Sequence, residues 1–314
     1  MDPLTSLLAG PRARGAFVLR AVLDPPWGLR IQDQAPLTVV AMSRGQAWVC
    51  PDNGAPMRLG PRDVAIARGP EPYTVLDDLG SPVQVVIHPG QRCATPDGVD
   101  LHEAMTLGVR TWGTSTTGAT VMLVGTYHMD GEVCAPLLRC LPPLLVLPAE
   151  PTTAPLVAML GEELQRDGPG QDAVLDRLLD LLLITALRDW LGRPDSGAPG
   201  WYAASADPVV GPALRLLQHN PAHPWSVGDL AAKVGVSRAA LARRFTALVG
   251  EPPMAYLTTW RLTLAADLLR EPDATVASVA RRVGYATPFA LSTAFKRVRG
   301  VSPAQYRSVT DGGS

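Results

Sequence analysis

A predicted helix that follows Ser237 carries small and basic side chains on its outward face: Arg238, Ala239, Ala242 and Arg243. Leu241 and Phe245, four residues apart, form the inward stripe of the same helix. An arginine flanked by small side chains can enter a DNA major groove and donate two hydrogen bonds to guanine, worth about 1–3 kcal/mol of discrimination. This face is therefore predicted to read base sequence.

A second predicted helix, after Thr287, presents a different outward face: Pro288, Phe289, Ser292 and Thr293. Leu291 and Phe295 form its inward stripe. The outward face has no charged donor, so we expect only apolar contact with thymine methyl groups and hydrogen bonds from hydroxyls. Basic side chains near the end of this helix are suited to DNA phosphates: Lys296, Arg297 and Arg299.

These two helices belong to a repeated unit, because residues 230–256 align with residues 279–306. The matched positions include turn glycines, buried aromatics and closing tyrosines: Gly235 and Gly284, Phe245 and Phe295, Tyr256 and Tyr306. A long helix between the two copies is predicted to bridge them. Two helical units, each with a short turn that contains glycine, fit a pair of helix-turn-helix motifs.

Each copy has the residues that start and stop helices. Ser226 and Asp229 form a capping box, and Gly235 stands where the chain needs a left-handed residue. In the second copy Thr287 is the predicted cap, and Pro288 takes the first helical position, where its missing N–H is not needed.

The first 150 residues predict strands of a sandwich or barrel. Short β-branched runs recur between turn signals: AFVLRAVL, LTVVAM, QAWVC, DVAIA, VQVVI and TVMLVGTYHM. Asn53-Gly54 predicts a hairpin between Cys50 and Met57. Residues 152–192 have helical spacing, and the span 178–187 is apolar nearly all round, which indicates a helix packed under the strands, a dimer interface, or both. A Gly- and Pro-rich stretch predicts a linker over 193–207.

The N-terminal part offers thiols and imidazoles as candidate chemistry. Redox sensing needs an activated thiolate, and the candidates are Cys93, Cys134 and Cys140. Their spacings, also with His88 and His102, match no standard zinc site, so no metal is predicted. We favour the alternative that the cysteines are buried as small apolar side chains.

A ligand pocket in this part would be lined by aromatic and polar side chains. The candidates are Trp27, Arg30, Trp48, Tyr127 and His128. Residues of these types are more often part of the core or the surface than ligand contacts, so both interpretations stay open.

Residues 208–308 resemble the AraC/XylS family of bacterial transcription regulators, most specifically in LARRFTALVGEPPMAYLTTWRLTLAADLLR and VARRVGYATPFALSTAFKRVRGVSPAQYR. The resemblance implies two recognition helices in successive major grooves, with these base-facing positions: Ala239, Ala242, Arg243, Pro288, Phe289 and Thr293. The sequence departs from the family at Thr293, usually Arg, and at Leu291, usually Phe. We therefore expect the first unit to dominate sequence reading.

The front part is similar to cupin-type sensor domains of that family, in DPLTSLLAGPRARGAFVLRAVLDPPWGLRI and APLLRCLPPLLVL. Enzymatic cupins hold a metal through paired histidines, and the corresponding strand, VAMSRGQAWVC, has none. The resemblance thus implies a sensor of small molecules or oxidants with no cofactor and no catalysis.

Composition agrees with a globular protein, because 46% of the residues are hydrophobic and 18% are charged. From Pro208 onward, 13 Lys and Arg face 6 Asp and Glu, although the whole chain has a net charge of −1. A basic block after an acidic one suggests that only the C-terminal part meets a polyanion. No secretion signal or membrane span is recognised, and we expect a cytoplasmic protein.

The predicted fold class is α+β. A cupin-like barrel or sandwich with its helical dimerisation segment spans 1–192, and an all-α domain spans 208–314, with helix-turn-helix units at about 226–248 and 275–298. The predicted function is a one-component transcriptional activator, with promoter DNA, RNA polymerase, an effector and a second copy of the chain as partners. Two alternatives remain: a cysteine-based alkyl acceptor linked to DNA repair, and a cupin enzyme tethered to DNA.

Overall fold

The computed structural model describes these residues of the 314-residue chain: 17–127, 132, 135–166, 168–198 and 200–311. They divide into two compact units, a β unit from Leu8–Asp130 and Leu141–Ser196 and a helical unit from Gly131–Cys140 and Gly197–Ser314. The expected α+β organisation is confirmed. No helix in the described ranges has the length and apolarity that crossing a membrane requires.

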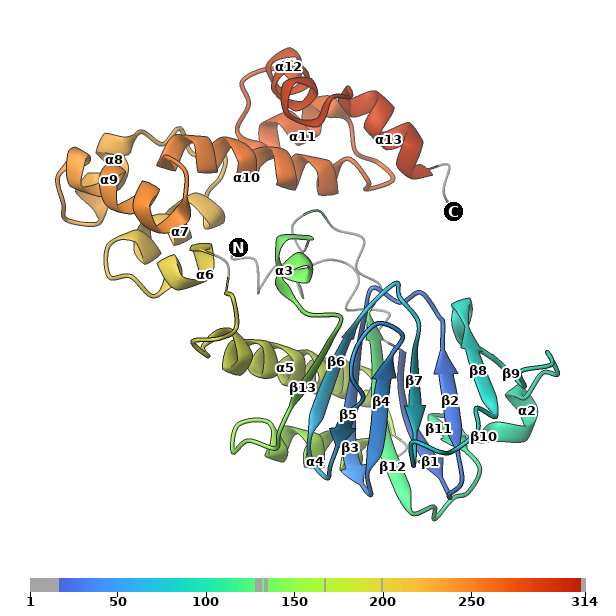
Figure 1. The fold of residues 1–314 in the computed structure, drawn as a ribbon. Helices are drawn as coiled ribbons and strands as arrows, with labels where there is room; N and C mark the ends of the chain where they lie inside the picture. The colour runs from blue at the N-terminus through green and yellow to red at the C-terminus, as the bar shows by residue number, and fades with distance from the viewer. Residues whose placement is uncertain (1–16, 128–131, 133–134, 167, 199, 312–314) are drawn as a thin grey trace. The chain divides into compact units, whose positions relative to one another are not determined.

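The β unit is a sandwich of two sheets (Figure 1). Its strands are β1 (Phe17–Leu23), β2 (Gly28–Ile31), β3 (Leu37–Arg44), β4 (Ala47–Pro51), β5 (Met57–Leu59), β6 (Val64–Arg68), β7 (Tyr73–Leu76), β8 (Val85–His88), β9 (Arg92–Ala94), β10 (Thr106–Gly108), β11 (Thr111–Gly113), β12 (Thr120–Tyr127) and β13 (Leu144–Leu147). The seven-stranded sheet has the order β10-β11-β1-β12-β3-β6-β13, and the six-stranded sheet has the order β5-β4-β7-β2-β8-β9. The β unit also has two short helical turns: η2 (Pro89–Gln91), between β8 and β9, and α2 (His102–Met105), before β10.

Two helices, α4 (Ala154–Glu163) and α5 (Gln171–Leu191), pack on the outer face of the seven-stranded sheet. The central strands β3 and β12 are consequently buried on both faces and read as nearly continuous apolar runs. Gly125 on β12 lies directly under Leu179 of α5, and a Cβ at this position would overlap the leucine side chain. The absence of a side chain at Gly125 thus lets the helix approach the sheet.

The helical unit consists of α3 (Ala135–Cys140), α6 (Gly200–Ser205), α7 (Val210–His219), α8 (Val227–Lys233), α9 (Arg238–Val249), α10 (Pro253–Leu268), α11 (Val276–Val283), α12 (Pro288–Arg299) and α13 (Pro303–Asp311). It has two hydrophobic cores, one under the first helix pair (α8 and α9) and one under the second helix pair (α11 and α12). The long helix α10 supplies Leu257 to the first core and Leu262 to the second. The repeat seen in the sequence is therefore a repeat of packed units.

Most predicted elements are found where the sequence places them. The six predicted strands correspond to β1, β3, β4, β6, β8 and β12, and the predicted hairpin pairs Val49 with Met57. Within residues 193–207, where the sequence suggests a linker, α6 forms and contacts α7 and α9. The C-terminal segment of the helical unit accordingly begins at Gly197.

Candidate nucleic-acid interface and ligand cavity

The first helix pair is held by the caps that the sequence predicts. The Ser226 Oγ accepts a hydrogen bond from the Asp229 backbone N–H at 3.1 Å, and Asp229 accepts one in return from the Ser226 N–H at 3.1 Å. Gly235 has φ of +72°, a left-handed conformation that glycine adopts at little cost. The Ser237 Oγ then accepts from the Ala240 N–H at 3.2 Å, which starts α9.

The outward face of α9 is as the sequence predicts. Leu241 and Phe245 are fully buried, whereas Arg238, Ala239 and Arg243 are exposed and Ala242 is half-buried between them. Within the described residues, the side chains of Arg238 and Arg243 form no ion pair and no hydrogen bond. Both guanidinium groups are thus open to a partner outside the chain.

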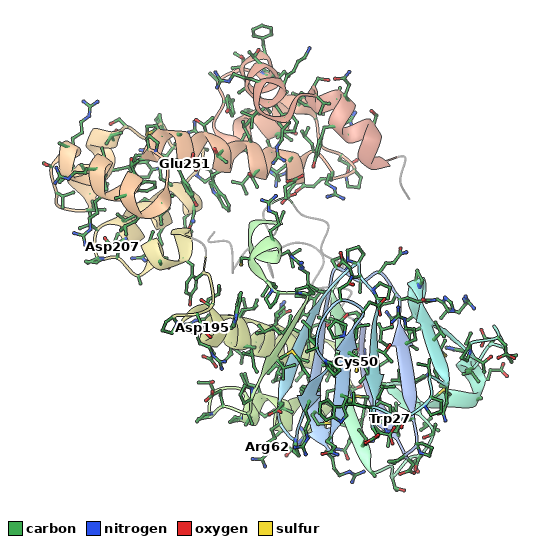
Figure 2. All side chains as sticks on the ribbon, in the orientation of Figure 1. Trp27, Cys50, Arg62, Asp195, Asp207 and Glu251 are labelled. Atoms are coloured by element: carbon green, nitrogen blue, oxygen red, sulfur yellow. The ribbon has the colours of Figure 1, made fainter. Side chains whose placement is uncertain are left out.

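Arg244, the next residue on α9, is held within the protein. Its Nε and Nη2 donate to Asp207 Oδ2 at 3.0 and 2.7 Å. Asp207, marked in Figure 2, also accepts from the Val209 and Val210 N–H groups at the start of α7, both at 2.9 Å. Burial would raise the pKa of Asp207, but the bonds from Arg244 and the backbone outweigh it and lower the pKa. Arg244 therefore anchors α9 to α7.

The second helix pair repeats this design with different chemistry. Thr275 and Ser278 form its capping box, and Thr287 accepts from the Ala290 N–H at 3.1 Å ahead of Pro288. Phe289 is 80% exposed, an unusual position for a phenylalanine. Pro288, Thr293, Lys296 and Arg297 are also exposed and Ser292 is half-buried, so the predicted surface of α12 is present and has no cation before Lys296.

Arg299 is engaged within the helical unit, although the sequence suggests it for phosphates. Its Nη1 donates to Glu132 Oε2 at 2.9 Å. Tyr306 Oη donates to Glu132 Oε1 at 3.2 Å, and the Glu132 N–H donates to Asp267 Oδ1 at 2.6 Å. No pattern near Glu132 signals this role, because its partners lie more than a hundred residues away.

Arg261 on α10 ties the bridging helix to the loop before α8. Its Nε donates to the Pro221 carbonyl at 2.6 Å and its Nη2 donates to the His223 carbonyl at 2.9 Å, both in the loop before α8. Burial lowers the pKa of Arg261. Gly284 of the second pair approaches the same loop, where a Cβ would lie 2.6 Å from the Ala222 Cα. The two recognition helices are thus joined through α10 and this loop.

The β unit has a cavity of about 690 Å³ between its two sheets, partly open to solvent. Aliphatic side chains from β1, β3 and β12 form one wall, and those from β2, β7 and β8 form the opposite wall. Polar side chains gather at one end, including Thr38, Tyr73 and Thr126. A cavity of this size and character is typical of small-molecule sites.

Among the candidate sensor residues, Cys93 lines this cavity and is 2% exposed. Trp27, marked in Figure 2, is buried in the core of the sandwich, and Trp48 is half-buried on β4. Arg30 forms an ion pair with Asp52 at 2.5 Å. These three side chains are not part of the cavity lining.

The remaining candidates lie elsewhere. Tyr127 points toward α5, where its Oη donates to Asp180 Oδ1 at 3.4 Å. Burial raises the pKa of Asp180 to about 6, although the charge of Arg177 opposes this shift. Cys140 is half-buried at the end of α3. His128 and Cys134 lie outside the described residues. In the described part of the chain, no three His, Cys, Asp or Glu side chains are grouped as a metal site requires.

Comparison with known proteins connects these features to a family. Residues 2–192 match the Cupin family, and residues 230–308 match the helix-turn-helix domain family. Two proteins described as AraC-like transcription regulators, from Streptomyces antibioticus and Streptomyces lividans, are each 34% identical over 98% of both chains. The DNA-binding domain of AdpA, solved in complex with a target DNA, is 38% identical over 33% of this chain and 93% of that chain, with a TM-score of 0.31. The chain belongs to the AraC family of transcription regulators, with a cupin domain ahead of its helix-turn-helix domain.

Proposed function

We propose that the protein is a one-component bacterial regulator that binds promoter DNA sequence-specifically, and that α9 supplies most of the base recognition. The observation that carries this proposal is the pair of exposed, unpaired arginines, Arg238 and Arg243, beside the small side chains of Ala239 and Ala242. The α12 surface, with Phe289 and Thr293, offers weaker base contacts, and its Lys296 and Arg297 serve the phosphates.

The proposed regulator acts in the cytoplasm, activates transcription with RNA polymerase, and responds to an effector in the β unit. The support for effector sensing is the cavity between the sheets. Its lining favours a small molecule over an oxidant, because a single buried thiol, that of Cys93, faces it among the described residues.

A binding measurement tests the role of α9. The DNA for this measurement is the duplex that binds the full-length protein most tightly after selection from a random library. The ionic strength is kept constant. Arg243→Ala should weaken binding by about 1–3 kcal/mol, or about 5- to 150-fold, because a bidentate contact to guanine is lost. Thr293→Ala is the matched change on α12 and should cost about threefold or less. An unchanged affinity for Arg243→Ala would refute the assignment.

We also propose a homodimer formed through α5. Most apolar side chains of α5 are buried, but Val174 and Leu181, two turns apart on the helix, are 44% and 51% exposed. Met159 on the neighbouring helix α4 is 52% exposed. Sedimentation equilibrium should give a dimer for the wild-type protein and a monomer for Leu181→Arg. A wild-type monomer at micromolar concentration argues against this interface.

A further inference from the structure

The walls of the cavity in the β unit are aliphatic and are not filled by the chain. Leu19 and Val124 face it from the seven-stranded sheet, and Ile31 and Ile87 face it from the six-stranded sheet. All four belong to the hydrophobic cluster between the sheets, yet each remains only partly buried. Inward-facing aliphatic side chains in a sandwich are normally close-packed, so their exposure here marks space for an apolar body.

Three hydroxyls are gathered at one end of this space. Thr38 and Thr126 are direct cross-strand partners on β3 and β12. Tyr73, from the opposite sheet, is hydrogen-bonded to Thr38. Burial raises the pKa of Tyr73, so its phenol stays protonated and neutral.

Thr126 is the hydroxyl without a partner. Its side chain is 2% exposed and lines the cavity, and its Oγ1 is buried with no hydrogen-bond partner among the described residues. A buried hydroxyl of this kind costs free energy until something bonds to it. Oγ1 can either donate or accept, so it suits an alcohol or a carbonyl.

The charged side chains of the lining are either engaged or exposed. Arg110 is paired with Asp172 and donates to the Val18 carbonyl at 3.2 Å. Asp33 accepts from Gln91 Nε2 at 2.9 Å and from the Ala35 N–H at 3.1 Å. The other charged or titratable members of the lining are exposed: Arg92, Asp100 and His102. Arg92, a lining cation without an ion pair among the described residues, is exposed, so no buried free cation faces the aliphatic walls.

We propose that this cavity binds an uncharged, mainly hydrocarbon molecule that carries one hydroxyl or carbonyl group, with the polar group bonded to Thr126 Oγ1. The inference rests on the proposed function, in which the cavity holds the effector, and it specifies the chemical class of that effector. A sugar would leave most of its hydroxyls against aliphatic walls, and a carboxylate beside Thr126 would be desolvated without a counterion. A volume of about 690 Å³ accommodates a molecule of ten or more carbons.

The test uses the full-length protein and a neutral fluorescent probe, N-phenyl-1-naphthylamine. The competitors share one chain length and differ in the end group: n-decane, n-decanol and decanoate at pH 8, with sorbitol as the polyol. We expect n-decanol to displace the probe best, decanoate at least about tenfold less well, and sorbitol not at all. Displacement by sorbitol, or by decanoate as effectively as by n-decanol, overturns the proposal.

Two variants test whether the ligand binds in the cavity. Thr126→Val removes the hydroxyl at nearly constant shape. It should weaken the affinity for n-decanol by about five- to tenfold and leave the affinity for n-decane unchanged. Thr120→Val is the matched control, since Thr120 is buried on the same strand but outside the lining. Val124→Trp fills the space and should abolish probe binding with an intact thermal transition. If Val124→Trp unfolds, the comparison of Thr126→Val with Thr120→Val decides alone. The proposal is overturned if Thr126→Val weakens the affinities for n-decanol and n-decane equally, or weakens neither.

DNA affinity measured on the same preparations separates this inference from the proposed function. If DNA binding is intact but no apolar competitor displaces the probe, the ligand class is wrong and the DNA-binding proposal stands. If n-decanol binds as expected but changes neither DNA affinity nor transcription in vitro, the ligand class stands and effector sensing is wrong.

Discussion

Arg243 and Arg244 are neighbours in the sequence and have different roles in the structure. Both lie on α9, but Arg244 is held by Asp207 while Arg243 is unpaired. Helical periodicity places Arg243 on the outward face and so predicts its exposure. It cannot reveal the partner of Arg244, because Asp207 lies 37 residues away and its position depends on packing.

The phosphate contacts proposed for α12 predict a change in salt dependence. The double variant Lys296→Ala, Arg297→Ala should reduce the slope of log K against log salt by about 2, because each contact contributes about 0.9. Base preference should not change. Fluorescence anisotropy between 50 and 200 mM salt, about the range where such slopes are resolved, provides the measurement.

Arg282→Ala serves as the control for this experiment. It removes one positive charge from the same helix pair, but Arg282 is engaged with Glu271 at 2.6 Å. The salt-dependence slope should therefore change by less than the loss of Lys296 alone or of Arg297 alone would change it. Equal slopes for the wild-type protein and the double variant would contradict the phosphate assignment.

The candidate sensor residues show what residue type alone fails to predict. Aromatic and polar character suggests Trp27, Arg30 and Tyr127 for a pocket, yet they lie in the core, in a surface ion pair and against α5. The cavity is lined instead by other side chains, mostly aliphatic or hydroxyl-bearing and in part charged, from many separate segments. Which of these face one another is decided by strand pairing, which is not readable from one sequence.

At the scale of elements, local signals predicted the helices of the C-terminal repeat well. Caps and turn glycines act within a few residues, so Ser226, Ser237 and Thr287 could be recognised directly from the sequence. The sequence did not predict seven strands of three or four residues, β2, β5, β7, β9, β10, β11 and β13, because such short runs carry little periodicity. The equally short β8 was recognised because it lies within a longer apolar run, VQVVI. The same limit applies to α6, which forms inside a stretch with the composition of a linker.

We expect Arg261 to make the spacing of the two helix pairs rigid. Arg261→Gln removes two charge-assisted hydrogen bonds to the loop before α8, while the two cores remain. The wild-type protein should discriminate strongly against a DNA site in which one base pair is inserted between the two contacted grooves. The variant should bind the original site several-fold more weakly and discriminate less.

The control for Arg261 is Arg215→Gln, an exposed position on α7 with the same loss of charge. Its penalty for the inserted base pair should equal that of the wild-type protein. If Arg261→Gln also shows the wild-type penalty, the spacing is set by other contacts.

At the scale of the whole molecule, the boundary in the sequence match and the boundary in the structure differ. The match to the Cupin family runs through residue 192, but residues 131–140 belong to the helical unit, where Glu132 binds Arg299 and Tyr306. Composition can show that a basic, repetitive C-terminal part follows an acidic, strand-rich part. It cannot show that one acidic side chain from the earlier part contacts the later one.

The claim that α9 provides most of the sequence reading is tested most directly by parallel selection. Full-length wild-type protein and Arg243→Ala each select duplexes from the same random library at the same salt concentration. The wild-type protein should enrich an asymmetric site with its strongest preference, a guanine, in one half, and the variant should lose that preference while the other half is unchanged. The same enriched site from both proteins would contradict the account.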